Sequence, residues 1–208
     1  MVRVKTFAVL LIGLGLTIGS SASVPQATSN TYRVTTGLVA VICPLTVGGS
    51  FEARTSAIVG DMTFADPSSV VTGAVQVDLA TLETGIGLRD RHMKDVYLEI
   101  RRGDTFATAR LEEIRIERAE GRTPFHATLS VHGEQRPISG VADLQGQRDG
   151  GVRVRARFPI SLAAFGIQPP RYLGVGVQDE VQVQVTFTAA TAPSYDYTLT
   201  QATSGVRR

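Results

Sequence analysis

Strict alternation of apolar and polar residues constrains the fold of this 208-residue chain more than any other feature. In the segment 152–160 every even position is Val, Ala, Phe or Ile, and every odd position is Arg or Pro. The segments 125–131 and 181–187 alternate in the same way. Successive residues of a β-strand point to opposite faces, so each segment is predicted to be a strand with one dry and one wet face.

Six further segments predict strands, with Gly, Pro, Asp or Ser at the breaks, which makes eight or nine in all. Strands with one apolar face each must close into a barrel or stack as a sandwich to bury that face. Of the two we favour an all-β fold, an eight-stranded antiparallel barrel. The six segments are Tyr32–Cys43, Ser50–Thr55, Ala57–Ala65, Val70–Leu82, Thr105–Ile116 and Gln135–Leu144.

Two helical interruptions are predicted, Leu88–Ile100 and Leu162–Gly166. In the first segment, apolar residues recur at roughly helical spacing. They are Leu88, Met93, Val96, Tyr97 and Ile100. This helix is expected near one mouth of the barrel, either as a lid or as a fixed connector whose apolar residues complete the core. For a lid, Gly85 and Gly87 would serve as hinges.

The N-terminal segment has the pattern of a signal peptide. Arg3 and Lys5 precede an apolar run of 12 residues, Phe7–Ile18, and small residues follow at 19–23. This run is shorter than the roughly 20 residues that span a bilayer, so stable membrane insertion is not expected. The predicted organisation is a signal peptide at 1–22, a linker at 23–31, the barrel domain at 32–190 and a flexible tail at 191–208. The location is periplasmic or secreted.

Net charge and cysteine content exclude several classes of function. The chain carries 21 Lys+Arg against 19 Asp+Glu, and loss of Arg3 and Lys5 with the leader would leave it neutral. A neutral chain lacks the positive field that nucleic-acid binding requires, so no nucleic-acid partner is expected. A single cysteine excludes an internal disulfide and any zinc site built on a pair of cysteines.

No metal site is expected from the three histidines. His126 and His132 share a strand face but lie roughly 20 Å apart along an extended strand, so they cannot bind one ion. His92 has no second ligand at a helical metal-binding spacing. We interpret them as surface or turn histidines.

No catalytic residues are predicted, and the protein is not expected to be an enzyme. The sequence contains no G-x-S-x-G elbow, and Cys43 has the strand parity of Val39 and Val41, which favours a small core residue over a reactive thiolate. Asp90 is expected to cap the first helix. The neighbouring basic side chains Arg89, Arg91 and Lys94 are expected to face water.

The alternating arginines at 153, 155 and 157 form one face of a predicted strand. They are interpreted as a solvated outer face that pairs with Glu112, Glu113 or Glu117 on another strand.

The inward faces predict the character of the lumen. An eight-stranded barrel is wide enough either to fill with side chains or to hold one small ligand. The inward positions are rich in Val and Ala, the chain has no Trp, and aromatic residues make up 6%. An elongated apolar ligand is therefore the expected guest. The expected ligand-binding residues are Val75, Val77, Leu79, Met93, Val96, Tyr97, Phe125, Leu129, Val131, Val154, Phe158, Val183 and Val185.

Five motifs, in this order, resemble the YceI-like family across about 32–190. They are GAVQVDLATLETG at 73–85, LRDRHM at 88–93, TLSVHGEQRP at 128–137, FPISLAAFGI at 158–167 and GVGVQDEV at 174–181. The resemblance implies a periplasmic, lipocalin-like β-barrel that binds polyisoprenoids or related long apolar lipids, without a cofactor or catalytic residues.

Two departures from the family pattern fall at the expected barrel mouth. The chain has CPLTV at 43–47 where the family commonly carries a basic or histidine-containing stretch, and YLEIR at 97–101 in place of a phenylalanine-rich segment. The identity of the lipid therefore does not transfer from the family.

Two functions follow from the sequence. The first is a carrier or buffer for a polyisoprenoid, quinone-like or fatty molecule, and the second is a partner-binding scaffold with a filled lumen and no physiological ligand. The oligomeric state is left open between a monomer and a homodimer.

Overall fold

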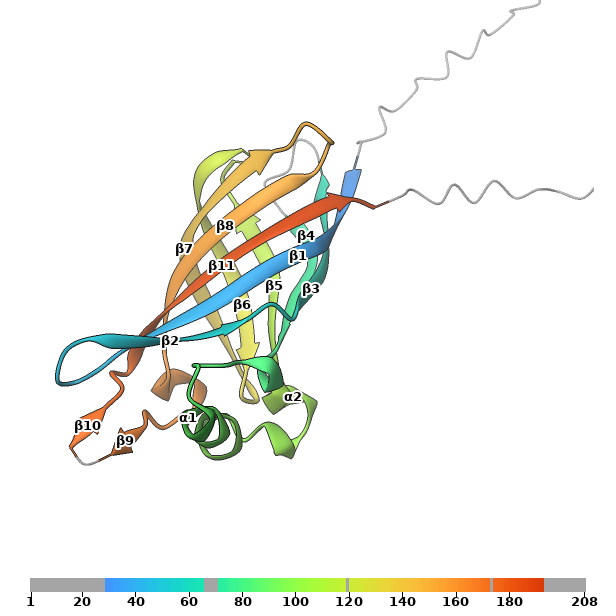
Figure 1. Ribbon diagram of the computed structural model, residues 1–208. Coiled ribbons are helices and arrows are strands. Elements are labelled where there is room, and N and C mark those ends of the chain that lie inside the picture. Colours follow the sequence, from blue (N-terminus) through green and yellow to red (C-terminus); the bar gives the residue numbers. More distant parts are fainter. Residues whose placement is uncertain (1–28, 66–70, 119, 173, 193–208) are drawn as a thin grey trace, which may run out of the picture.

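The computed structural model describes residues 29–65, 71–118, 120–172 and 174–192 (Figure 1). The expected signal peptide, most of the expected linker and nearly all of the expected tail lie outside these residues. Nine antiparallel strands make up the main sheet. They are β1 (Ser29–Pro44), β2 (Ser50–Thr55), β3 (Ile58–Ala65), β4 (Val71–Asp78), β5 (Thr108–Ile116), β6 (Gly121–Val131), β7 (Glu134–Gly146), β8 (Val152–Ser161) and β11 (Glu180–Thr191).

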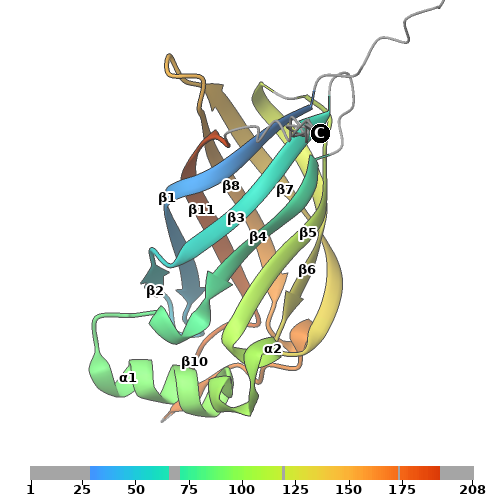
Figure 2. The ribbon, with the colours of Figure 1, turned by 90° about the vertical axis from the view of Figure 1, so that its right-hand side faces the viewer.

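The sheet closes into a barrel because its first and last strands pair. The strand order is β11-β8-β7-β6-β5-β4-β3-β1-β2, and β11 also pairs with β1 from Tyr32↔Thr191 to Ile42↔Gln182. On its other edge β1 pairs first with β3 and then with β2, so these two short strands share one place in the circuit (Figure 2). The eight-stranded antiparallel barrel predicted from the sequence is confirmed.

Most strand boundaries lie within a few residues of those expected. β1 begins at Ser29, three residues inside the expected linker, and β11 runs to Thr191. β4 ends at Asp78, because the next residues form the 3₁₀ helix η1 (Leu79–Thr81), where the Asp78 carboxylate accepts a hydrogen bond from the Ala80 backbone N–H.

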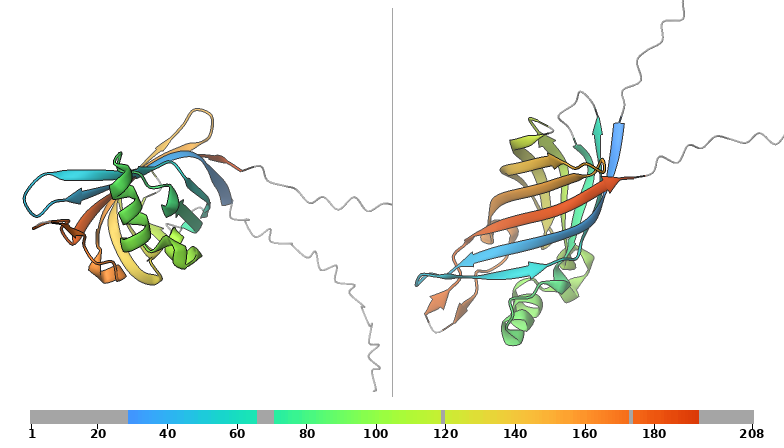
Figure 3. Two further views of the ribbon diagram at one scale, coloured as in Figure 1. Left: turned by 60° about the horizontal axis from the view of Figure 1, so that its bottom comes forward. Right: turned by 45° about the horizontal axis from the view of Figure 1, so that its top comes forward.

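One end of the barrel, here called the mouth, is covered by short elements (Figure 3). A continuous lid segment, residues 87–102, crosses it. The lid segment consists of α1 (Gly87–His92), the π-helix η2 (Met93–Tyr97) and the 3₁₀ helix η3 (Ile100–Arg102). The predicted helix is therefore present but broken near its end, where Glu99 has a φ of 49°. The other elements at the mouth are α2 (Asp104–Ala107), η4 (Ala163–Phe165), β9 (Arg171–Tyr172) and β10 (Val175–Gly176).

Inward and outward side chains alternate as the sequence pattern requires. Along β8, Val152, Val154 and Phe158 are buried while the arginines between them are exposed. The Phe158 ring meets the Phe125 ring edge to face, with centroids 5.8 Å apart. Burial of these apolar faces supplies the main driving force for folding.

The expected pairing of the β8 arginines with glutamates is wrong. Two strands, β7 and β6, separate β8 from β5, which carries Glu112 and Glu113. Glu112 instead forms an ion pair with Arg110 at 2.9 Å, and Glu113 accepts a hydrogen bond from the Thr128 hydroxyl. The cause is sheet order, which alternation within one strand does not reveal.

Gly140 on β7 tests how tightly the barrel wall is packed. A Cβ atom at this position would lie 2.7 Å from Cε1 of Phe125 and 2.8 Å from Cβ of Phe158, and it would also clash with the Arg157 carbonyl oxygen. We expect Gly140→Ala to lower the free energy of unfolding by about 1–3 kcal/mol, the usual cost of overpacking. Urea denaturation measures this change.

The matched control is Gly146→Ala on the same strand, where no atom lies within 4 Å of an added Cβ. This variant should unfold within about 0.5 kcal/mol of the wild type, as is usual for surface substitutions. Equal midpoints for the two variants would contradict the tight approach at Gly140.

Candidate functional site

The barrel encloses a cavity of about 1090 Å³. Its wall is built from the inward side chains of the strands, and the lid segment contributes Met93, Tyr97 and Leu98 at the mouth. The volume lies slightly above the usual range for small-molecule sites, which is about 300–1,000 Å³. The lumen is therefore not filled by the protein's own side chains.

The cavity wall is almost entirely apolar. Among the described residues that line it, the side chains that carry a polar or ionisable group are the thiol of Cys43, the phenol of Tyr97 and the basic groups of Arg89, His92 and Arg171. None of these lining residues is acidic. Such a wall favours hydrocarbon and offers polar contacts at few points.

The structure brings twelve of the thirteen predicted ligand-binding residues to this one wall. They are Val75, Val77, Leu79, Met93, Tyr97, Phe125, Leu129, Val131, Val154, Phe158, Val183 and Val185. Val96 does not line the cavity, and its side chain is 59% exposed. Its α-helical spacing of three residues from Met93 was misleading because η2 is a π-helix, which changes the angle between successive side chains.

Several lining residues were missed by the sequence prediction. Val39 and Val41 on β1 and Phe51 on β2 belong to the wall. The alternation within β1 carried enough signal to find the first two. Phe51 lies in a short strand whose inward face depends on pairing with β1, where it stands opposite Cys43.

Arg89 does not face water as expected. Its guanidinium carbon lies 4.3 Å from the centroid of the Phe51 ring, which joins α1 to β2 by a cation–π contact. Burial raises the pKa of the nearby Cys43 thiol to about 11, and the positive charge of Arg89 opposes that shift. Cys43 is thus a neutral thiol on the cavity wall, consistent with the predicted core role.

Asp90 does not cap α1 as expected, because the N-cap position is Ile86. The Asp90 carboxylate instead accepts hydrogen bonds from the backbone N–H and the hydroxyl of Thr84, at 2.7 and 2.5 Å. The hydrogen bond from the Thr84 hydroxyl is the main cause that lowers the Asp90 pKa. This carboxylate therefore fastens the turn before the lid segment to its first helix.

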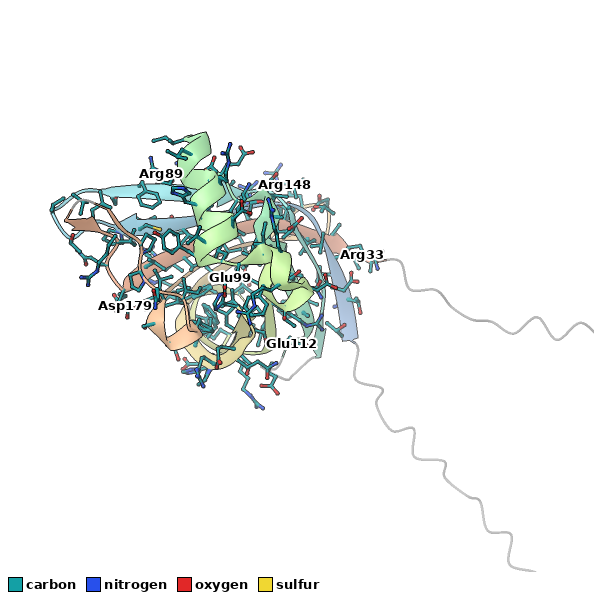
Figure 4. All side chains as sticks on the ribbon, turned by 90° about the horizontal axis from the view of Figure 1, so that it is seen from below. Arg33, Arg89, Glu99, Glu112, Arg148 and Asp179 are labelled. Carbon is teal, nitrogen blue, oxygen red and sulfur yellow. The ribbon has the colours of Figure 1, made fainter. Side chains whose placement is uncertain are left out.

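The other end of the lid segment carries Glu99, which is labelled in Figure 4. It is fastened to the β6–β7 turn through His132. His132 lies in a turn, one of the two positions expected for the histidines, but its side chain is only 9% exposed. Its Nε2 lies 3.2 Å from Oε2 of Glu99, and its Nδ1 lies 3.0 Å from the carbonyl oxygen of Phe165. The Phe106 ring packs edge to face against the imidazole, with centroids 4.8 Å apart.

The other two histidines do not form a shared site with His132. His126 is exposed and lies 2.8 Å from the Ser139 hydroxyl, while His92 lines the cavity. Within the described ranges, no group of three His, Cys, Asp or Glu side chains is arranged to hold a metal ion.

Comparison with known proteins places this architecture among known barrels. The family model of the YceI-like domain matches residues 24–189. The structure of BcnA from Burkholderia cenocepacia superposes with a TM-score of 0.60 at 17% identity, covering 74% of this chain and 96% of that one. A polyisoprenoid binding domain from Saccharophagus degradans, implicated in plant cell wall breakdown, superposes with a TM-score of 0.61 at 16% identity, covering 77% and 98%.

No curated protein matches the chain at a significant level. Among the helices in the described part of the chain, none is long and apolar enough to span a bilayer.

The raised pKa of Cys43 predicts slow alkylation of the folded protein. A thiol with a pKa near 11 holds about a hundredfold less thiolate at pH 8 than one with the ordinary value of 9.0. Iodoacetamide should therefore react about a hundredfold more slowly with native protein than with protein in urea. The native rate should still rise between pH 9 and 10.5; a plateau there would contradict a pKa of about 11.

Proposed function

The chain belongs to the YceI-like family, and from that premise we propose that it is a periplasmic or secreted lipid-binding protein that holds a long apolar molecule in its barrel. The observation that carries this proposal is the cavity of about 1090 Å³ with its apolar wall. An apolar chain that leaves water for such a wall gains roughly 0.8 kcal/mol per buried methylene group. A long hydrocarbon is therefore the guest that this wall favours most.

Within that class, the proposed guest is a polyisoprenoid, a quinone-like molecule or a fatty chain. The Saccharophagus degradans neighbour is described as a polyisoprenoid binding domain, which supports the isoprenoid option. The apolar wall suits a hydrocarbon chain, and the basic and phenolic groups lie on lid and mouth elements, at Arg89, Tyr97 and Arg171. A guest with a long tail and a small polar end matches this distribution.

The alternative, a scaffold without a ligand, required a filled lumen. An empty volume of this size inside a barrel forfeits packing contacts, which destabilises a protein unless something fills the space. The open lumen therefore favours the carrier over the scaffold.

We assign no reaction to the barrel. Acid–base or nucleophilic chemistry needs a nucleophile beside a base and an orienting acid. The described cavity-lining residues include the neutral Cys43 thiol but no carboxylate to orient a base. The wall is suited to holding a guest without altering it.

A substitution inside the lumen tests the ligand directly. Leu129 on β6 lines the cavity and is 7% exposed, so Leu129→Trp should occupy part of the space that a lipid would fill. Overpacking should cost about 1–3 kcal/mol of stability. Native mass spectrometry of purified protein should show a bound lipid in the wild type and little or none in this variant.

Leu38→Trp is the matched control, because Leu38 lies on β1, does not line the cavity and is 47% exposed. This variant should retain the lipid. If Leu129→Trp folds and carries as much of the same lipid as Leu38→Trp, Leu129 does not contact the ligand.

Hydrogen exchange distinguishes a mobile lid from a fixed connector. The first helix of the lid segment follows Gly85, whose φ is 79°, and is held by Asp90 and Arg89, whereas the far end is anchored at His132. We expect amides of 87–97 to exchange rapidly in lipid-free protein and to gain protection with lipid, with the larger gain in 87–92. Equal protection in both states would identify a fixed connector.

A further inference from the structure

Exposed large apolar side chains gather at the mouth of the barrel. Seven are found in the described part of the chain, and five of them lie on the mouth elements, next to α1 or in the β1–β2 turn. The other two, Leu38 and Val59, lie on the strands of the barrel wall. The mouth group, with exposed fractions, comprises Val47 (67%), Leu88 (62%), Val96 (59%), Ile86 (51%) and Val175 (38%).

Contacts bring the segments that carry these residues together at the mouth. The backbone N–H of Thr46, beside Val47, donates to the carbonyl of Gly176, beside Val175, at 2.8 Å. The contact of Arg89 with Phe51 brings α1 against the same β1–β2 hairpin. Seen from the mouth end, α1 crosses the opening between this hairpin and the rest of the barrel (Figures 3 and 4).

The apolar lining of the cavity continues onto this surface. Ile86, Leu88 and Val175 line the cavity and are also exposed to solvent. The opening also carries the polar side chains of Arg89, His92 and Arg171. Apolar residues that line a cavity and remain exposed beside such groups are typical of a site that faces an apolar phase or a partner.

The same face carries basic side chains that form no close ion pair with a described residue. Within the described ranges, no carboxylate lies within ion-pair distance of Arg91, Lys94 or Arg171. The lid carboxylates are engaged elsewhere, since Asp95 pairs with Arg101 and Glu99 with Arg102. Residues 87–102 carry five Lys and Arg against three Asp and Glu, so the lid segment has a formal net charge of +2 with histidine neutral.

We propose that the mouth face docks onto a lipid bilayer that contains anionic phospholipid. The exposed apolar side chains would enter the boundary between headgroups and acyl chains, and the basic side chains would contact phosphate groups, as in interfacial helices. This inference rests on the proposed function, because a lipid guest resides in bilayers. A mouth pressed against the membrane lets the guest pass between bilayer and barrel without crossing water.

Val96 offers the sharpest test, because it is exposed but does not line the cavity. Flotation of the exported, purified protein with vesicles of 70% phosphatidylcholine and 30% phosphatidylglycerol should recover wild-type protein with the vesicles. Val96→Glu should weaken this binding about tenfold, since it withholds one apolar side chain and adds a negative charge. Val59→Glu, at an equally exposed valine (61%) on the barrel wall, should bind as the wild type does.

A charge substitution tests the electrostatic part. Arg91→Glu should weaken binding by more than tenfold, because each charge near an anionic surface contributes about a fivefold effect. Arg153→Glu, on the exposed face of β8 near the end of the barrel opposite the mouth, should have little effect. Binding should fall in 0.5 M salt and on vesicles of phosphatidylcholine alone.

Native mass spectrometry keeps the two proposals apart. A bound lipid in Val96→Glu and Arg91→Glu, together with weakened vesicle binding, supports docking as a separate step. Absence of wild-type binding to the anionic vesicles, or equal binding by Val96→Glu and Val59→Glu, would overturn the docking proposal and leave lipid binding untouched. Loss of lipid along with vesicle binding in both mouth variants would also overturn it, by placing Val96 and Arg91 at the ligand.

Discussion

Pairing of the first strand with the last is the interaction on which the rest of the structure depends. Without it the sheet would be open, with two unpaired edges and an apolar face that nothing covers. The pairing also requires the β1 backbone to approach neighbouring side chains closely at Gly37. A Cβ atom there would lie 2.5 Å from Cγ2 of Ile58 and 2.9 Å from Cβ of Phe187. Closure turns every apolar strand face inward and thereby defines a lumen, so folding and the creation of the binding cavity are one event.

The size of the inward side chains then decides whether that lumen is core or cavity. Eight strands set the barrel radius, and around Val39, Val41, Val183 and Val185 the branched side chains are too short to meet across it, so space remains. An unfilled core weakens packing. A guest that binds only the folded state restores part of the lost folding stability by mass action. If the proposed function holds, stability and ligand occupancy are coupled through the same residues, and no separate binding motif is needed in the sequence.

The sequence predicted the barrel wall well because its signal is local. Alternation at 125–131 and 152–160 assigns each side chain to a face without knowledge of any other strand, and all seven predicted wall residues of β6, β8 and β11 line the cavity. The mouth was predicted less well. The outward position of Val96 depends on a π-turn, the stacking of Arg89 depends on where β2 lies, and the burial of His132 depends on the arrival of Glu99 and Phe165 from distant segments. These are long-range consequences of closure that periodicity does not encode.

The two ends of the lid segment differ in how they are held, and this difference bears on how a guest reaches the lumen. At the far end, Glu99 contacts both Arg102 and the buried His132, and Phe106 packs against the same imidazole. At the near end, the exposed Leu88 follows two glycines around which an added Cβ would meet no atom within 4 Å. The near end is thus the part of the lid with the fewest packing restraints, and it is also the part where the apolar cavity wall reaches the surface. A membrane that contacts the mouth would touch the lid at the point where displacement breaks the fewest contacts.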